Sequence, residues 1–281
     1  MPAEDKERIL AEAAGMPGVH GGFEFQEPVL PWPSGEKPTS VTLGGVKGVA
    51  VRTPGVRRDF AFVHIHGGGF FGGSPVTGYR TMLALKTRFG MDSFSIDYTR
   101  TPHKTAPAQV EECAAFYRAV LALGYERIFL AGESAGGNLV VCLTLWLRDH
   151  GLPPPAAVAA SSPVLDLSGR IKRPAHDMFS EDTDKVRADY VGDFDVESPY
   201  VSPIYGDFTS FPPLLLQAGT TESLRFDSLY LGRKLEDSSC DCTVSIWEGA
   251  PHAIGLDVVD TWFSRNCMEE IIGFFAEKAG L

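Results

Sequence analysis

The chain has 281 residues, of which 44% are hydrophobic and 22% charged, which suits one large globular domain with an appendage or two small domains. Its net charge of −11 argues against nucleic acid and anionic membrane surfaces as partners. No stretch reaches the ~18 apolar residues of a membrane span, and residues 1–8 lack the apolar core of a signal peptide.

Strand-like and helix-like segments alternate along most of the chain. An N-terminal arm of about residues 1–36 is followed by a hairpin expected around Gly44-Gly45. The later strands are expected at 60–65, 92–97, 127–131, 156–160, 214–218 and 243–247, and the helices at 77–89, 106–123, 135–148, 224–236 and 258–279. This alternation predicts an α/β fold, a mostly parallel sheet with helices on both faces. We expect residues 1–281 to form a single domain.

One segment, about residues 168–207, interrupts the alternation with charged and irregular sequence. A stretch of this length without a strand-helix rhythm is typical of an insertion with its own role. We therefore expect it to contribute a small cap over the sheet; the alternative is an ordinary surface excursion.

The most informative motif is Gly132-Glu133-Ser134-Ala135-Gly136-Gly137, which lies between an expected strand and an expected helix. A G-x-S-x-G sequence in this context is typical of a nucleophile elbow, a tight turn that projects the serine hydroxyl from the top of a sheet. Upstream, His66-Gly67-Gly68-Gly69-Phe70 forms a glycine-rich loop whose backbone N–H groups can face a developing oxyanion. Together the motifs predict acyl transfer at Ser134.

A serine nucleophile needs a base and an acid, which in this kind of sheet follow it in the order acid, then histidine. Two histidines lie far enough downstream, His176 in the insertion and His252 in the loop after a core strand; His252 is the expected base. The acid should follow the strand at 214–218, where Glu222 and Asp227 are the candidates. Glu222 is favoured because it is nearer the strand end, and Asp227 is expected to be a solvated or capping carboxylate one turn into a helix.

These motifs resemble the hormone-sensitive-lipase-like branch of the α/β-hydrolases, in its small bacterial family IV esterase form, over residues 60–275. The segments at 97–112, 219–227 and 248–252 are similar to further blocks of that family. The resemblance implies an α/β-hydrolase fold and an oxyanion hole made by the backbone N–H groups of Gly68, Gly69 and Ala135. The larger type-B carboxylesterases share several of the motifs, but their chains are about twice as long.

The chain departs from the family pattern at several positions. The usual acid is aspartate, whereas Glu222 is one methylene longer, so its loop must lie farther back or its side chain must fold. Ser223 replaces a proline, Ile254 replaces a phenylalanine, and the segment 100–103 differs from the usual L-A-P-E. The resemblance therefore does not imply the usual family contacts at these positions.

No metal or cofactor is expected. His64 and His66 are spaced like a metal-binding pair, and so are Cys240 and Cys242, but neither pair has further ligands at a suitable spacing. The five cysteines are an odd number without a disulfide framework, which favours reduced thiols in a cytoplasmic protein.

The sequence thus predicts a cytoplasmic carboxylesterase-type serine hydrolase that acts on small short-acyl esters through Ser134, His252 and Glu222. One alternative is a non-catalytic small-molecule receptor on the same fold, which the presence of all three side chains disfavours. Another is hydrolysis of amides, carbamates or sugar acetates by the same machinery, which sequence does not separate from ester hydrolysis. The sequence does not decide between a monomer and a homodimer.

Overall fold

A computed structural model describes residues 37–52, 59–173, 186–252 and 261–281. The expected N-terminal arm, His176 and Ile254 lie outside these residues. One eight-stranded sheet organises the chain, with strand order β1-β2-β4-β3-β5-β6-β7-β8. The strands are β1 (Thr39–Leu43), β2 (Val46–Val51), β3 (Phe60–Ile65), β4 (Asp92–Ile96), β5 (Arg127–Glu133), β6 (Ala157–Ser161), β7 (Leu214–Gly219) and β8 (Cys242–Trp247).

The sheet is antiparallel at one edge and parallel elsewhere. β2 pairs antiparallel with both β1 and β4, whereas every neighbouring pair from β4 to β8 is parallel. Parallel strands end at the same edge of the sheet, so the loops that follow β3, β5, β7 and β8 are brought together there.

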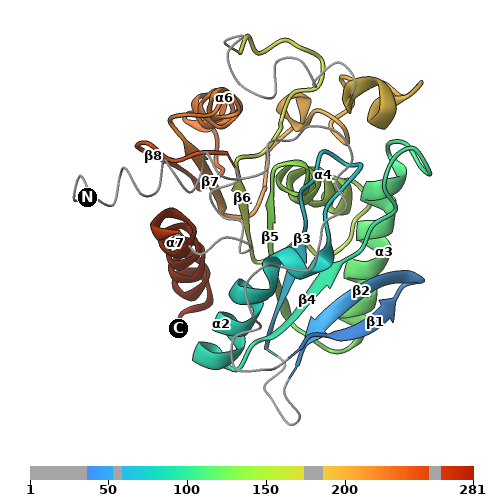
Figure 1. The fold of residues 1–281 in the computed structure, drawn as a ribbon, viewed down its shortest axis with the longest axis vertical. Helices are drawn as coiled ribbons and strands as arrows, with labels where there is room; N and C mark the ends of the chain where they lie inside the picture. The colour runs from blue at the N-terminus through green and yellow to red at the C-terminus, as the bar shows by residue number, and fades with distance from the viewer. Residues whose placement is uncertain (1–36, 53–58, 174–185, 253–260) are drawn as a thin grey trace.

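Helices cover both faces of this sheet (Figure 1). The helices are α2 (Tyr79–Phe89), α3 (Ala108–Ala122), α4 (Ala135–Asp149), α6 (Arg225–Leu235) and α7 (Trp262–Ala279). Apolar residues of α3, α4 and α6 share one buried cluster with the sheet, and those of α2 and α7 share the other. The predicted mostly parallel sheet with helices on both faces is confirmed.

The side-chain alternation of β3 explains this two-sided core. Val63 and Ile65 pack in the cluster that contains α3 and α4, whereas Phe60 and Phe62 pack in the one that contains α7. The Phe62 ring lies 5.9 Å from that of Phe275 in α7. Because both faces are buried, the strand is a nearly continuous apolar run in the sequence, interrupted only by His64, as is typical of a central parallel strand.

The connection from β6 to β7 contains the expected insert, defined here as residues 168–207. Its described parts are 168–173 and 186–207, and they include a helical segment at 186–191 and the 3-10 helix η3 (Pro203–Tyr205). In Figure 1 these parts, coloured yellow to gold, lie beyond the ends of the central strands on the same side as the start of α4.

Candidate active site

Ser134 occupies a sharp turn between β5 and α4, as the elbow motif predicts. Its backbone has φ 55° and ψ −118°, a conformation that favours glycine, so a serine here is held in strain by the structure around it. The start of α4 also approaches β3 very closely: a Cβ at Gly136 would lie 2.0 Å from the Ile65 carbonyl oxygen. Only glycine at that position therefore permits the turn that presents Ser134 at the carboxyl edge of the sheet.

Hydrogen bonds join Ser134, His252 and Glu222 in a continuous line. The Ser134 Oγ lies 3.1 Å from the His252 Nε2, and the His252 Nδ1 lies 2.5 Å from the Glu222 Oε2. Glu222 follows β7 and His252 follows β8, so parallel strands deliver both side chains to the same edge of the sheet as the serine. This order of contacts, hydroxyl to imidazole to carboxylate, is the geometry by which a histidine can accept a serine proton.

Glu222 is buried, with 2% of the residue exposed, and its charge is balanced by several donors. Its Oε1 accepts hydrogen bonds from the Gly219 backbone N–H at 2.8 Å and from the Ser162 hydroxyl at 2.7 Å. The side chain thus reaches back toward the end of its own strand, which accommodates the additional methylene of glutamate. Ser162 itself has a positive φ of 48°, directly after β6.

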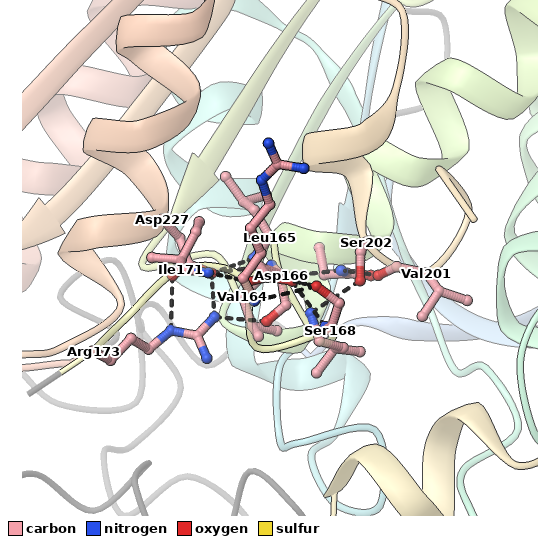
Figure 2. Close-up of polar contacts among 12 residues, drawn as sticks. Val164, Leu165, Asp166, Ser168, Ile171, Arg173, Val201, Ser202 and Asp227 are labelled. Atoms are coloured by element: carbon pink, nitrogen blue, oxygen red, sulfur yellow. Dashed lines mark hydrogen bonds and ion pairs between the residues drawn. The ribbon is translucent and has the colours of Figure 1, made fainter. Parts of the chain in front are cut away.

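Asp227, the other candidate acid, is not in contact with His252 through any bond that the described residues show. It is fully buried in the first turn of α6, so the expectation of a solvated or capping carboxylate is wrong. Its carboxylate oxygens accept hydrogen bonds from the Arg173 guanidinium at 2.6 and 2.8 Å and from the backbone N–H groups of Leu165 and Asp166 at 2.7 and 3.1 Å (Figure 2). Burial raises the pKa of Asp227, and the bond from Arg173 opposes that rise.

The glycine-rich loop lies directly after β3, beside the elbow. Gly68 and Gly69 have φ of 106° and 60°, and the Gly68 carbonyl accepts hydrogen bonds from the N–H groups of Phe71 and Gly72. A Cβ at Gly68 would lie 2.5 Å from the Gly72 carbonyl carbon. Within the described part of the chain, the N–H groups of Gly68, Gly69 and Ala135 donate to no acceptor, so they are available to a bound oxyanion.

A buried carboxylate behind Ser134 holds this loop, and the sequence reasoning missed it. The Glu133 Oε1 accepts from the Gly67 N–H at 2.7 Å, and its Oε2 lies 2.8 Å from the His64 Nε2. The His64 Nδ1 in turn lies 2.9 Å from the Ser95 Oγ. The only signal in the sequence was position, since Glu133 precedes the nucleophile and His64 precedes the loop.

His66 has a different environment from His64, although the two are close in sequence. Its Nδ1 donates to the Gly67 carbonyl oxygen at 2.7 Å, and its ring stacks on Tyr98 with centroids 4.4 Å apart. Burial lowers the pKa of His66 from 6.5 to about 3. Across the residues that the structure describes, no group of potential metal ligands gathers around these histidines or around Cys240 and Cys242.

Arg100 holds the far end of the glycine-rich loop, in the segment where the chain departs from the usual L-A-P-E. Its guanidinium donates to the carbonyl oxygens of Gly72 and Gly73 at 3.2 and 2.8 Å and to the Asp97 carboxylate at 2.7 Å. The loop is therefore fastened by Glu133 at its start and by Arg100 at its end.

Comparison with known proteins places this arrangement in a family. A model of the α/β-hydrolase fold family matches residues 62–256. The chain is 33% identical over 215 residues to the acetyl-hydrolase of Streptomyces hygroscopicus, covering 74% of this chain and 72% of that protein. It is also 34% identical over 208 residues to LipR of Mycobacterium tuberculosis, named for acetyl-hydrolase activity, covering 70% of this chain and 66% of LipR. The alignment thus spans slightly less than two thirds of LipR.

Solved structures of esterases have a similar fold. An esterase from the bacterial hormone-sensitive lipase family has a TM-score of 0.84 at 26% identity, with 99% of each chain covered. A hormone-sensitive lipase from a metagenome library has a TM-score of 0.79 at 28% identity, covering 89% of this chain and 86% of that one.

The chain is a hormone-sensitive-lipase-like esterase of the α/β-hydrolase superfamily. The expected fold and the carboxylesterase-type hydrolase class are thereby confirmed. No helix among the described residues is long and apolar enough to cross a membrane.

Proposed function

We propose that this esterase hydrolyses small esters through an acyl-enzyme formed on Ser134. The observation that carries the proposal is the hydrogen-bonded line from the Ser134 Oγ through His252 to Glu222. A serine hydroxyl is a weak nucleophile at neutral pH, and an imidazole within hydrogen-bond distance is the group that can accept its proton during attack.

In the proposed reaction, Ser134 attacks the ester carbonyl while His252 Nε2 takes the hydroxyl proton. Glu222 holds the Nδ1–H and stabilises the imidazolium that forms. The backbone N–H groups of Gly68, Gly69 and Ala135 stabilise the oxyanion of the tetrahedral intermediate. The imidazolium then protonates the departing alcohol, and a water molecule activated by the same imidazole releases the acid from the serine.

Short acyl chains are the proposed substrates. Several similar proteins are named acetyl-hydrolases or acetyl esterases, which supports a small acyl pocket here by relation. A series of p-nitrophenyl esters of increasing acyl length tests this preference, with kcat/KM expected to be greatest for the shortest acyl groups. A greatest value for long acyl chains would contradict it. Parallel assays with amide, carbamate and sugar-acetate substrates separate the reactions that share this machinery.

Replacement of the nucleophile tests the mechanism. Ser134→Ala should lower kcat by on the order of 10⁴ to 10⁶ without unfolding the protein, because the hydroxyl acts in the transition state. A fluorophosphonate probe should label the wild type stoichiometrically and leave the variant unlabelled. Wild-type protein that resists the probe would indicate a receptor, and ester turnover in Ser134→Ala within tenfold of wild type would exclude Ser134 as the nucleophile.

We further infer a cytoplasmic location from the cysteines. All five are free thiols, at positions 113, 142, 240, 242 and 267, and a reducing compartment keeps thiols in that state. Burial raises the pKa of Cys240 to about 11 and that of Cys242 to about 12, so these neighbouring thiols are unreactive at neutral pH. Fractionation of the native cells tests the location; recovery outside the cytoplasm would contradict it.

A further inference from the structure

Both described parts of the insert contact segments that adjoin the proposed catalytic groups. Arg173, in its first described part, reaches the segment that carries Glu222. Tyr190, in its second described part, packs against the residue that follows the oxyanion glycines. Arg173 thus reaches the acid-bearing part of the chain through Asp227, and Tyr190 reaches the oxyanion loop through Phe70.

On the acid side, Arg173 and Asp227 form a buried, two-pronged ion pair. The Arg173 Nε and Nη2 lie 2.8 and 2.6 Å from the two Asp227 carboxylate oxygens, and Nη2 also donates to the Asp166 carbonyl oxygen at 2.7 Å. The Arg173 side chain is 10% exposed and that of Asp227 is 0% exposed. Two parallel bonds fix orientation as well as distance, and Figure 2 shows the guanidinium between Asp227 and the backbone of Asp166.

Asp227 and Glu222 both accept hydrogen bonds from the segment at residues 162–166. Asp227 accepts from the N–H of Leu165 at 2.7 Å, and Glu222 accepts from the hydroxyl of Ser162 at 2.7 Å. Glu222 lies in the short segment between β7 and α6, and Asp227 lies in the first turn of α6. A displacement of Asp227 is therefore expected to move the 162–166 segment, which contacts Glu222 through the Ser162 hydroxyl.

On the oxyanion side, the Tyr190 ring is stacked on Phe70. The ring centroids are 3.6 Å apart and the planes are inclined by 6°. Phe70 directly follows Gly69 and has a positive φ of 67°, and its carbonyl oxygen accepts from the Thr101 N–H at 3.0 Å. The Tyr190 hydroxyl is buried and bonds to no partner among the described residues, so the ring and not the hydroxyl makes this contact.

We infer that Arg173 and Tyr190 are positioning residues, through which the insert holds the acid-bearing loop by way of Asp227 and the oxyanion loop by way of Phe70. This inference rests on the function proposed above. Within the described ranges, the Arg173 side chain bonds to Asp227 and Asp166 and the Tyr190 ring stacks on Phe70, so both act through another residue. Because they fix groups that stabilise the transition state, their loss should lower kcat more than it changes KM.

The acid side is tested with Arg173→Met and with the double variant Arg173→Met/Asp227→Asn. The single variant leaves a buried carboxylate without its counter-ion and should lose thermal stability. The double variant removes both charges and keeps an acceptor for the Leu165 N–H, so it should regain much of that stability. Arg170→Met is the matched control, since Arg170 is an exposed arginine of the same insert.

With p-nitrophenyl acetate as substrate, kcat of the double variant should be about 10- to 100-fold below that of wild type, because small displacements of catalytic groups reduce the rate by such factors. KM should change little. The downfield ¹H resonance of the proton between His252 and Glu222 should shift or broaden, which a purely structural role would not cause. A stable double variant with wild-type kcat and an unchanged resonance would overturn the acid-side inference.

The oxyanion side is tested with Tyr190→Leu and Tyr190→Phe. Leucine removes the stacked ring, so kcat and the second-order rate of fluorophosphonate labelling should both fall, by about tenfold or more. Phenylalanine keeps the ring and removes only the unpartnered hydroxyl, so it should restore both rates to near the wild-type values. Equal rates for the folded leucine variant and wild type would overturn the oxyanion-side inference.

Failure of this inference is distinct from failure of the proposed function. Complete labelling of every insert variant at Ser134, together with wild-type kcat, would reject the positioning roles and leave the nucleophile intact. Ester turnover by Ser134→Ala would instead reject the mechanism on which both proposals stand.

Discussion

Replacing Glu222 by glutamine should disable the proposed triad through a mismatch of hydrogen-bond donors, beyond the loss of charge. Both carboxylate oxygens of Glu222 are acceptors: Oε2 faces the His252 Nδ1 at 2.5 Å, and Oε1 faces the Gly219 N–H at 2.8 Å and the Ser162 hydroxyl at 2.7 Å. Glutamine offers one acceptor oxygen and one NH₂ group in nearly the same volume.

Neither orientation of that glutamine preserves the wild-type contacts. With its oxygen toward Gly219, the NH₂ group faces the His252 Nδ1, and the imidazole must carry its proton on Nε2, where it is no longer a base for Ser134. With its oxygen toward His252, the NH₂ group meets the Gly219 N–H, and two buried donors face each other. The Ser162 hydroxyl can rotate to accept, but a backbone N–H cannot.

We therefore expect kcat to fall by on the order of 10³ to 10⁴ in Glu222→Gln, which corresponds to about 4 to 5.5 kcal/mol of lost transition-state stabilisation. The assay compares kcat of Glu222→Gln and Asp227→Asn at the same pH, about 8. Asp227→Asn should lose stability because Arg173 loses its charged partner, but its folded fraction should turn over at least about tenfold faster than Glu222→Gln.

The reverse outcome would refute the reasoning. If Asp227→Asn abolishes turnover while Glu222→Gln keeps it within tenfold of wild type, Glu222 is not the acid. A third variant, Glu222→Asp, tests the side-chain length separately from the charge. Turnover near wild type in that variant would show that the loop also accepts the shorter acid usual in the family.

Three further predictions concern the buried groups around the oxyanion loop. Gly69→Ala should lower kcat by about 10² or more, the loss expected for one oxyanion donor. Gly68→Ala should lower kcat further, because its Cβ would lie 2.5 Å from the Gly72 backbone. A fully active Gly69→Ala variant would show that the loop has another role. Because burial lowers the pKa of His66 from 6.5 to about 3, the unfolded chain binds a proton there that the folded protein does not. The stabilisation is therefore present above pH 6.5 and lost at up to roughly 1.4 kcal/mol per pH unit as the pH falls toward 3. His66→Asn should flatten that slope in denaturant unfolding measured at each pH, and an unchanged slope would contradict the assignment. Glu133→Gln keeps an acceptor for the Gly67 N–H but loses the charge beside His64, so kcat should fall by about tenfold with little change in KM; equal kcat for variant and wild type would show that the charge is not needed.

The strands and helices were predictable because each is a local pattern. β3 is apolar at every position except His64, and β5 leads directly into the elbow motif, so their positions follow from burial on both faces and from turn chemistry. Chain order and strand ends also pointed to His252 and Glu222, and these are the side chains that the structure joins to Ser134.

The ionic contacts were not predictable, because they join residues that are distant in sequence. Asp227 looked like a helix-end carboxylate until the fold brought Arg173, 54 positions earlier, against it. Glu133 and His64 are 69 positions apart and reveal their pairing only when β3 and β5 lie side by side. Whether a carboxylate can be buried depends on the hydrogen-bond donors that the completed fold places around it. Local sequence periodicity does not predict those donors.

The backbone conformation of Ser134 lowers the stability of the fold at the position that the proposed turnover requires. Its φ of 55° and ψ of −118° are comfortable for glycine and cost a residue with a Cβ on the order of 1 to 3 kcal/mol. A lineage released from the need to hydrolyse esters could relieve that strain by one substitution to glycine, and would gain a more stable protein. The backbone conformation at position 134 is thus best suited to glycine, whereas the proposed reaction requires the hydroxyl of a serine.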